Sequence, residues 1–278
     1  MDFTSIPLKQ ERNRVWRTYQ GGLLMDQWLG KEGSDGDTPE EWIASTVEAR
    51  GAGRPVGEGL SIVTWNNERN TLKDLIAMAP EKMLGKRIAN KYGDTALLIK
   101  LLDASDRLSV QVHPDKVFAK QYLNSDFGKT EGWYILNTRE IGGEPAYIYL
   151  GFKEGVTKEI WGQLFQKQDI LGMLNCMHKV SVTPGQVYII KGGLPHAIGP
   201  GCFMMEIQEP TDFTMRTEKV MPDGKLMPEV LVHQGVGEDL MLDCFHYEAL
   251  TMEETLKKYQ LVPKLISQSE DYTCTTLI

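Results

Sequence analysis

Two histidines and a glutamate have the side chains that a catalytic zinc ion prefers. His113 ends the segment LSVQVH, Glu131 precedes the apolar run GWYIL, and His196 lies in the glycine-rich segment GGLPHAIGPG. Two imidazoles and one carboxylate suit zinc in a site that keeps an open position for substrate. Gln111, two residues before His113, could add an oxygen ligand. The spacings between these residues match no short metal-binding motif. The proposed group of zinc ligands is therefore a hypothesis that rests on residue type alone.

The segment 108–113 alternates apolar and polar residues, as a β-strand with two unlike faces does. Ser109, Gln111 and His113 would share the polar face. This face could simply meet water, and His196 could be an ordinary exposed loop histidine. Lys129 and the glutamate two residues after it, at the entrance of the next strand, favour a functional site instead.

Charged residues in and after the strand-like run CFMMEIQ could bind an anionic substrate. Glu206 lies within this run, and Asp212 and Arg216 follow it. The permanent charge and forked donors of arginine suit a phosphate or a developing oxyanion. The alternative for Asp212 and Arg216 is a surface ion pair, which would contribute little. Lys100 in ALLIKLL could extend to solvent at a barrel rim or reach inward to a phosphate.

Short runs rich in branched and aromatic residues must position these side chains. The runs are ALLIKLLD, LSVQVH, GWYIL, AYIYLGF, KVSVT, QVYII and CFMMEIQ. Pro-Gly and Gly-Gly turns between the last of them favour a sandwich or a jelly-roll barrel. Helical patterns are found at about 70–92, at about 157–175 and in a capped stretch at 251–258. We therefore expect a mainly β protein, a β-barrel with helical additions.

Composition and charge exclude several classes of protein. With 41% hydrophobic and 24% charged residues, the chain is neither disordered nor fibrous. Its net charge of −8, without a basic block, argues against binding to nucleic acid or an anionic membrane. Four scattered cysteines without a C-x-x-C pair suit a reducing compartment. No signal-peptide core or apolar span is present, so we expect a cytoplasmic protein.

Four motifs in order resemble the type I phosphomannose isomerases (mannose-6-phosphate isomerases) of the short bacterial kind. They are LSVQVHPDK, GKTEGWYIL, LPHAIGPG and EIQEPTDFTMR. ALLIKLLDA and, more loosely, RTYQGGLL and EEWIAST extend the resemblance over about residues 15–220. The resemblance implies a cupin-type jelly-roll β-barrel with one zinc ion per chain. It also implies interconversion of mannose 6-phosphate and fructose 6-phosphate through an enediol.

The resemblance further implies roles for individual residues. Zinc would be bound by Gln111, His113, Glu131 and His196. Arg216 matches the family's active-site arginine, and Lys129 and Asp212 fall on polar positions around the sugar. We expect these three residues to be catalytic.

The phosphorylated hexose would be bound by further polar groups of the same segments. The candidates are Ser109, Lys129, Lys100 and Glu206. The base that moves the proton between C1 and C2 stays open among Asp212, Glu206, Lys129 and a zinc-bound water, because geometry decides before pKa does.

Two features depart from the family pattern. Lys191, in the loop Ile190-Lys191-Gly192-Gly193, would add a cation near the mouth of the site. We treat residues 1–278 as a single cupin-type unit whose region after about 220 is shortened relative to the family. The final run, DYTCTTLI, would either pair backwards or continue into a longer natural chain.

Two other functions fit the same residues. A non-catalytic sugar-phosphate-binding or regulatory cupin would keep the pocket without turnover. An Fe(II)-dependent cupin oxygenase would use two histidines and a carboxylate, although glutamine at position 111 replaces the first histidine of an H-x-H pair. The oligomeric state is not predicted.

Overall fold

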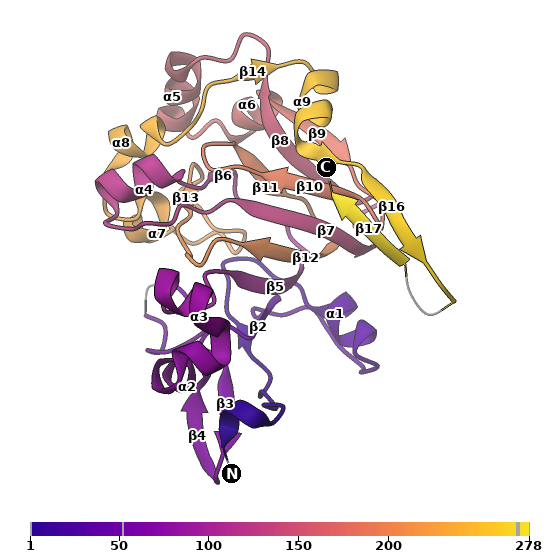
Figure 1. Ribbon diagram of the computed structural model, residues 1–278. Coiled ribbons are helices and arrows are strands. Elements are labelled where there is room, and N and C mark those ends of the chain that lie inside the picture. Colours follow the sequence, from indigo (N-terminus) through magenta and orange to yellow (C-terminus); the bar gives the residue numbers. More distant parts are fainter. Residues whose placement is uncertain (1, 52, 271–272, 278) are drawn as a thin grey trace.

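Two sheets form the body of the molecule in the computed structural model, which describes residues 2–51, 53–270 and 273–277 (Figure 1). The seven-stranded sheet has the order β1 (Arg14–Val15), β2 (Glu40–Ile43), β5 (Leu98–Asp103), β12 (Cys202–Gln208), β7 (Glu131–Thr138), β10 (Val187–Ile190) and β15 (Gln260–Leu261). The second sheet has the order β13 (Met215–Arg216), β6 (Gln111–Val112), β11 (His196–Ile198), β8 (Tyr147–Lys153) and β14 (Ala249–Leu250), with β9 (Met177–Ser181) also on β8. Among the described residues, the strands pair antiparallel except β14 with β8. This is the mainly β architecture that the strand-like runs predict.

Apolar side chains from both sheets meet between them. The central cluster includes Leu102, Trp133, Ile135, Ile148, Leu150, Val180, Tyr188, Ile190, Ile198 and Met204. A second cluster covers the other face of the six-stranded sheet, where Val110 and Val112 pack with Phe152, Trp161 and Phe165. The two faces of the β6 region are therefore both buried, and the interpretation of a water-facing polar strand is wrong.

Helices form where the sequence patterns place them. α2 (Leu72–Met78) and α3 (Pro80–Tyr92) lie with the hairpin of β3 (Ile62–Trp65) and β4 (Glu68–Thr71) and the short 3-10 helix η1 (Phe3–Ser5) below the barrel in Figure 1. α5 (Lys158–Lys167) and α6 (Ile170–Asn175) occupy the second predicted segment. α9 (Met252–Tyr259) begins with a capping box, in which Thr251 and Glu254 bond each other's backbone N–H groups.

Four short helices lie outside the predicted segments. They are α1 (Leu23–Trp28), α4 (Lys116–Tyr122), α7 (Glu229–His233) and α8 (Glu238–Asp243). α7 and α8 pack against the six-stranded sheet through Leu231, Val232, Met241 and Leu242. None of the described helices is both long enough and apolar enough to cross a membrane.

The last described strand pairs backwards. β17 (Thr273–Leu277) forms an antiparallel hairpin with β16 (Pro263–Gln268), drawn in yellow in Figure 1. Every residue of β16 is exposed. Residues 271–272 and 278 of the run DYTCTTLI lie outside the described residues. The described part of this run therefore pairs backwards, which is one of the two predicted alternatives.

Candidate metal centre and active-site pocket

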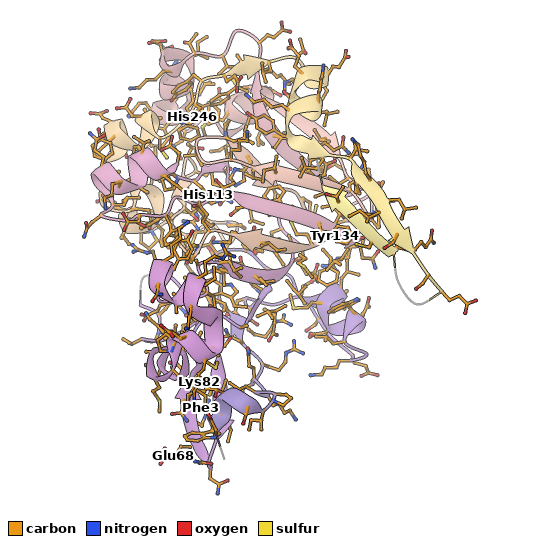
Figure 2. The ribbon with its side chains drawn as sticks, viewed as in Figure 1. Phe3, Glu68, Lys82, His113, Tyr134 and His246 are labelled. Carbon is orange, nitrogen blue, oxygen red and sulfur yellow. The ribbon has the colours of Figure 1, made fainter. Side chains whose placement is uncertain are left out.

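Three buried side chains converge inside the barrel. His113 follows β6, Glu131 begins β7 and His196 begins β11, and Figure 2 shows His113 within the β-rich part of the molecule. One potential ligand atom from each of the three lies within 4.8 Å of the others. Both histidines are fully buried. The interpretation of His196 as a solvent-exposed loop histidine is therefore wrong.

Backbone carbonyls fix the orientation of both imidazole rings. His113 Nδ1 lies 2.8 Å from the carbonyl oxygen of Phe213, and His196 Nδ1 lies 2.9 Å from that of Leu194. Because a carbonyl only accepts hydrogen bonds, each Nδ1 carries the proton and each Nε2 is left with its lone pair. This is the arrangement in which a histidine presents Nε2 to a metal ion while its other nitrogen is held by the protein.

The protonation states of the cluster also suit a cation. Burial lowers the pKa of His113 to about 3 and also lowers the pKa of His196, so both rings are neutral near pH 7. Burial alone would raise the pKa of Glu131, but opposing influences, among them the Lys129 ammonium 3.1 Å away, hold that pKa well below its usual value. Two neutral imidazoles and an ionised carboxylate form a donor set for zinc.

One oxygen of the cluster lacks a well-directed hydrogen bond. Glu131 Oε1 lies 3.0 Å from His113 Nε2 and 3.1 Å from Lys129 Nζ, yet accepts no such bond from the described residues. Gln111 adjoins the same cluster, since its side-chain nitrogen lies 3.1 Å from His196 Nε2. β6 and β11 pair Gln111 directly with His196. A metal ion would satisfy the buried carboxylate oxygen, so these residues fit one.

A small polar pocket adjoins the cluster. Of the residues predicted for the site, its lining contains Lys100, Ser109, Gln111, Lys129, Glu131, Glu206, Asp212 and Arg216. His113 and His196 lie behind this lining. The structure thus brings the four sequence motifs to one place. Lys191, by contrast, is exposed at a separate cavity beside His246 and adds no charge to the pocket wall.

Lys100 reaches inward, so the alternative of a lysine extending to solvent is wrong. Its ammonium is buried 3.0 Å from Glu206 Oε1 and 3.7 Å from Glu40 Oε2. Burial and the nearby charge of Glu131 raise the pKa of Glu206 despite this lysine. The indole N–H of Trp133 lies 3.0 Å from carboxylate oxygens of both Glu131 and Glu206. The predicted metal ligand and the Lys100–Glu206 pair are therefore parts of one buried network.

Arg216 and Asp212 do not form the surface pair considered as an alternative. Arg216 donates to the carbonyl oxygens of Leu231, at 2.8 Å, and Thr214, at 3.3 Å. No carboxylate among the described residues lies within ion-pair distance of it, and burial lowers its pKa to about 10. Asp212 pairs instead with Arg17, at 3.5 Å. Arg216 therefore brings an uncompensated positive charge to the pocket.

Sequence reasoning missed the side of the pocket that the N-terminal segments build. Arg17, Tyr19 and Glu40 line it. Tyr19 donates its hydroxyl to Glu40 Oε1 at 2.8 Å, and Arg17 pairs with Glu40 Oε2 at 2.9 Å. The signal was the loose family resemblance of RTYQGGLL and EEWIAST, the two stretches in which these residues lie.

Comparison with known sequences identifies relatives of this chain. Residues 57–131 match the family model described as phosphomannose isomerase type I, catalytic domain. A mannose-6-phosphate isomerase from Streptococcus mutans is 38% identical over 207 residues, which make up 74% of this chain and 58% of that protein. The matches to two Bacillus subtilis relatives cover 36% and 40% of those proteins. The chain therefore spans only part of the length of the relatives it matches.

Solved structures resemble the whole described fold. The mannose 6-phosphate isomerase from Bacillus subtilis has a TM-score of 0.72 and 21% identity, covering 98% of this chain and 76% of that one. A zinc-bound mannose 6-phosphate isomerase has a TM-score of 0.63 and 16% identity, covering 94% of this chain and 78% of that one.

The two-sheet barrel with a buried His–Glu–His cluster is a cupin-type fold with helical additions, which confirms the predicted fold class. The sequence matches confirm the predicted resemblance as well. The chain is related to the type I phosphomannose isomerases.

Proposed function

We propose that the chain is a zinc-dependent aldose–ketose isomerase that interconverts mannose 6-phosphate and fructose 6-phosphate. The observation that carries the proposal is the buried His113, Glu131 and His196 cluster beside a pocket with an unpaired arginine. The Streptococcus mutans relative, named mannose-6-phosphate isomerase, supports the choice of substrate.

We propose Gln111, His113, Glu131 and His196 as the zinc ligands, one ion per chain. The donor set and the zinc-bound protein of the same fold support zinc. When bound, zinc supplies a Lewis acid that polarises substrate oxygens. The carbonyls of Phe213 and Leu194 keep the two rings turned toward the ion's position.

We propose that Arg216 stabilises negative charge on the substrate. Conversion of an aldose to a ketose moves a proton between C1 and C2 and places negative charge on oxygen in the enediol stage. A guanidinium that already faces the pocket without a carboxylate partner can offset that charge without first breaking an ion pair. Ser109 and Lys100, on the same wall, would hold the phosphorylated sugar in place.

Three side chains of the pocket are candidates for the proton transfer. Lys129 lies nearest the proposed ligands, 3.1 Å from Glu131 and 3.3 Å from His113. Asp212 stays ionised, because Arg17 and Lys100 lower its pKa although burial opposes them. Glu206 has a raised pKa and so holds a proton more readily. A side chain that takes up a proton and later returns it must be able to exist in both its protonated and its deprotonated form.

We further propose that residues 1–278 work as a single unit, since β1 and β15, which lie far apart in the chain, are strands of the same seven-stranded sheet. A phosphorylated hexose is then its small-molecule partner. The four cysteines are free, two of them fully buried, which supports a cytoplasmic location.

A coupled assay of mannose 6-phosphate conversion tests the proposal. The wild-type chain should turn over, and His113→Ala with His196→Ala should abolish both turnover and zinc content. His246→Ala is the matched control, because His246 is exposed and pairs with Asp115, at 3.1 Å, outside the proposed ligand set. A wild-type chain that binds the sugar phosphate without converting it would identify the non-catalytic alternative instead. Full zinc occupancy in the double variant would refute the ligand assignment.

A further inference from the structure

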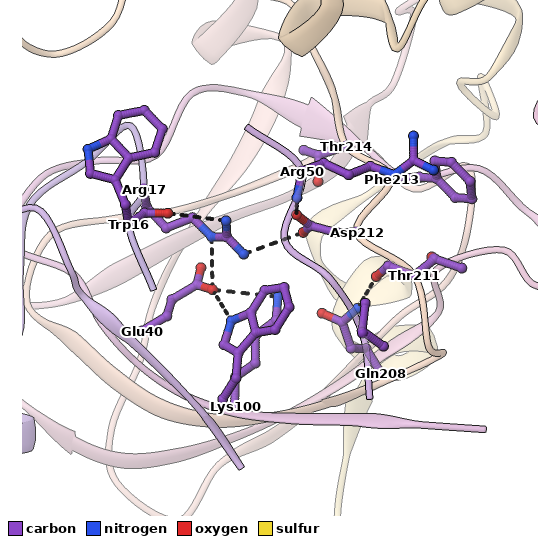
Figure 3. Close-up of polar contacts among 12 residues, drawn as sticks. Trp16, Arg17, Glu40, Arg50, Lys100, Gln208, Thr211, Asp212, Phe213 and Thr214 are labelled. Carbon is purple, nitrogen blue, oxygen red and sulfur yellow. Dashed lines mark hydrogen bonds and ion pairs between the residues drawn. The ribbon is translucent and has the colours of Figure 1, made fainter. Parts of the chain in front are cut away.

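Arg17 joins two carboxylates that come from distant parts of the chain. Its Nε lies 2.9 Å from Glu40 Oε2 and its terminal nitrogen lies 3.5 Å from Asp212 Oδ1 (Figure 3). A third contact, from its other terminal nitrogen to the carbonyl oxygen of Trp16, measures 3.2 Å. Its guanidinium also stacks over Trp42, 4.9 Å from the ring centre. All three nitrogens of Arg17 therefore already have partners.

The two arginines of the pocket differ in this respect. Arg216 binds only backbone carbonyls and carries free positive charge toward the substrate, whereas Arg17 is neutralised by its two carboxylates. The side chain of Arg17 is 11% exposed, and those of Glu40 and Asp212 are 5% and 8% exposed. A guanidinium that is paired with buried carboxylates holds them in one orientation, because its N–H donors form a rigid planar fork.

We infer that Arg17 is a positioning residue for the isomerase reaction, which holds the Asp212 carboxylate at the pocket wall while Arg216 is left for the substrate. The inference rests on the proposed function. Asp212 has one other anchor, since its Oδ2 accepts the backbone N–H of Arg50 at 2.8 Å. With Arg17 on Oδ1 and the Arg50 N–H on Oδ2, both oxygens of the carboxylate are oriented.

Several charged groups act on Asp212 from the surrounding segments. They are Arg17 after β1, Lys100 on β5, Lys129 before β7 and Arg216 on β13. The guanidinium of Arg50 lies over the ring of Phe213. Burial raises the pKa of Asp212, and Arg17 is the largest influence that lowers it. Removal of Arg17 should therefore raise the pKa of Asp212, because the nearest opposite charge is lost.

The experiment compares Arg17→Met and Arg17→Lys in the full chain, alone and combined with Asp212→Asn. Arg12→Met is the matched control, because Arg12 forms a similar pair with Glu41, at 2.7 Å, outside the pocket. Arg17→Met should lower kcat on mannose 6-phosphate by about 10²-fold, the cost of misplacing a reacting group, with little change in KM. Arg17→Lys should recover part of this, since lysine keeps the charge but cannot span both carboxylates.

Two readouts separate positioning from other roles. In the Asp212→Asn background, Arg17→Met should cost little further activity, because the group it positions is already gone. Carbon-13 NMR of labelled aspartate, with Asp212→Asn to assign the signal, should show the Asp212 pKa moving upward in Arg17→Met but not in Arg12→Met.

Each contrary result overturns the inference. A large rise in KM at unchanged kcat would make Arg17 a phosphate ligand, and full additivity with Asp212→Asn would remove the link between the two residues. If the wild type does not convert mannose 6-phosphate, the proposed function fails. The NMR titration then still decides whether Arg17 controls Asp212, and an unmoved pKa would refute that control. Should Arg17→Met not fold, Arg17→Lys carries the same comparisons.

Discussion

Replacement of Arg216 by alanine separates the chemical step from substrate binding. The guanidinium is held by two backbone carbonyls and has no carboxylate partner among the described residues. Its removal therefore leaves no buried charge uncompensated, and the variant should keep its fold and its zinc. The proposed zinc ligands are untouched by the change.

The expected loss follows from where the charge acts. If Arg216 meets negative charge that develops only during proton transfer, kcat and kcat/KM should fall together. Removal of a preorganised donor of this kind costs about 10²–10³ in kcat, or about 2.7–4 kcal/mol of transition-state stabilisation. Arg216→Lys should recover only part of the rate, because it keeps the charge and loses the fork.

Steady-state kinetics on mannose 6-phosphate measures these changes. Arg69→Ala is a suitable control, since Arg69 is an exposed arginine paired with Glu11 outside the pocket. An Arg216→Ala enzyme with unchanged kcat and a large rise in KM would assign the residue to phosphate binding. If both constants were unchanged, the reasoning that places Arg216 in the active site would be refuted.

Three further predictions concern stability. Lys100→Met should destabilise the fold by about 3–5 kcal/mol in urea unfolding, because it leaves the buried Glu206 without its partner, whereas the exposed Lys82→Met should have little effect. Thr251→Ala should cost about 1 kcal/mol through loss of the α9 cap. In metal-free protein, stability should fall as pH drops from about 6.5 toward 3, by up to about 1.4 kcal/mol per pH unit from His113 alone. Because the pKa of His113 is about 3 in the folded protein, only the unfolded chain protonates this histidine between these pH values. A free energy of unfolding that does not change with pH in this range would contradict the burial of His113.

The alternation in 108–113 was enough to place Ser109, Gln111 and His113 on one face, because the pleat of a strand has a period of two. The same rule could not say whether that face met water or the interior. For the same reason it could not say whether Lys100 extends to solvent or points inward. One face becomes internal only because the second sheet packs over the first. Lys129 and Glu131 at the entrance of the next strand, and then the family resemblance, favoured a functional site over a strand that faces water.

Arg17 and Glu40 show what local patterns cannot supply. Arg17 lies in an irregular segment after the two-residue strand β1, and its partner Asp212 is 195 residues away in the chain. No periodicity relates such positions. His196 was expected in a loop because Pro195 and the neighbouring glycines predict turns, yet pairing with β6 and β8 makes it the first residue of a strand.

Zinc-dependent isomerisation can be measured as the rate of fructose 6-phosphate formation from mannose 6-phosphate, followed by NMR while zinc is removed with a chelator and then returned. We expect conversion by the protein as isolated, loss of conversion after zinc is removed, and recovery with one equivalent of zinc per chain. Conversion that persists in protein free of zinc and other metals would refute a zinc-dependent isomerase, as would the absence of conversion by zinc-loaded protein.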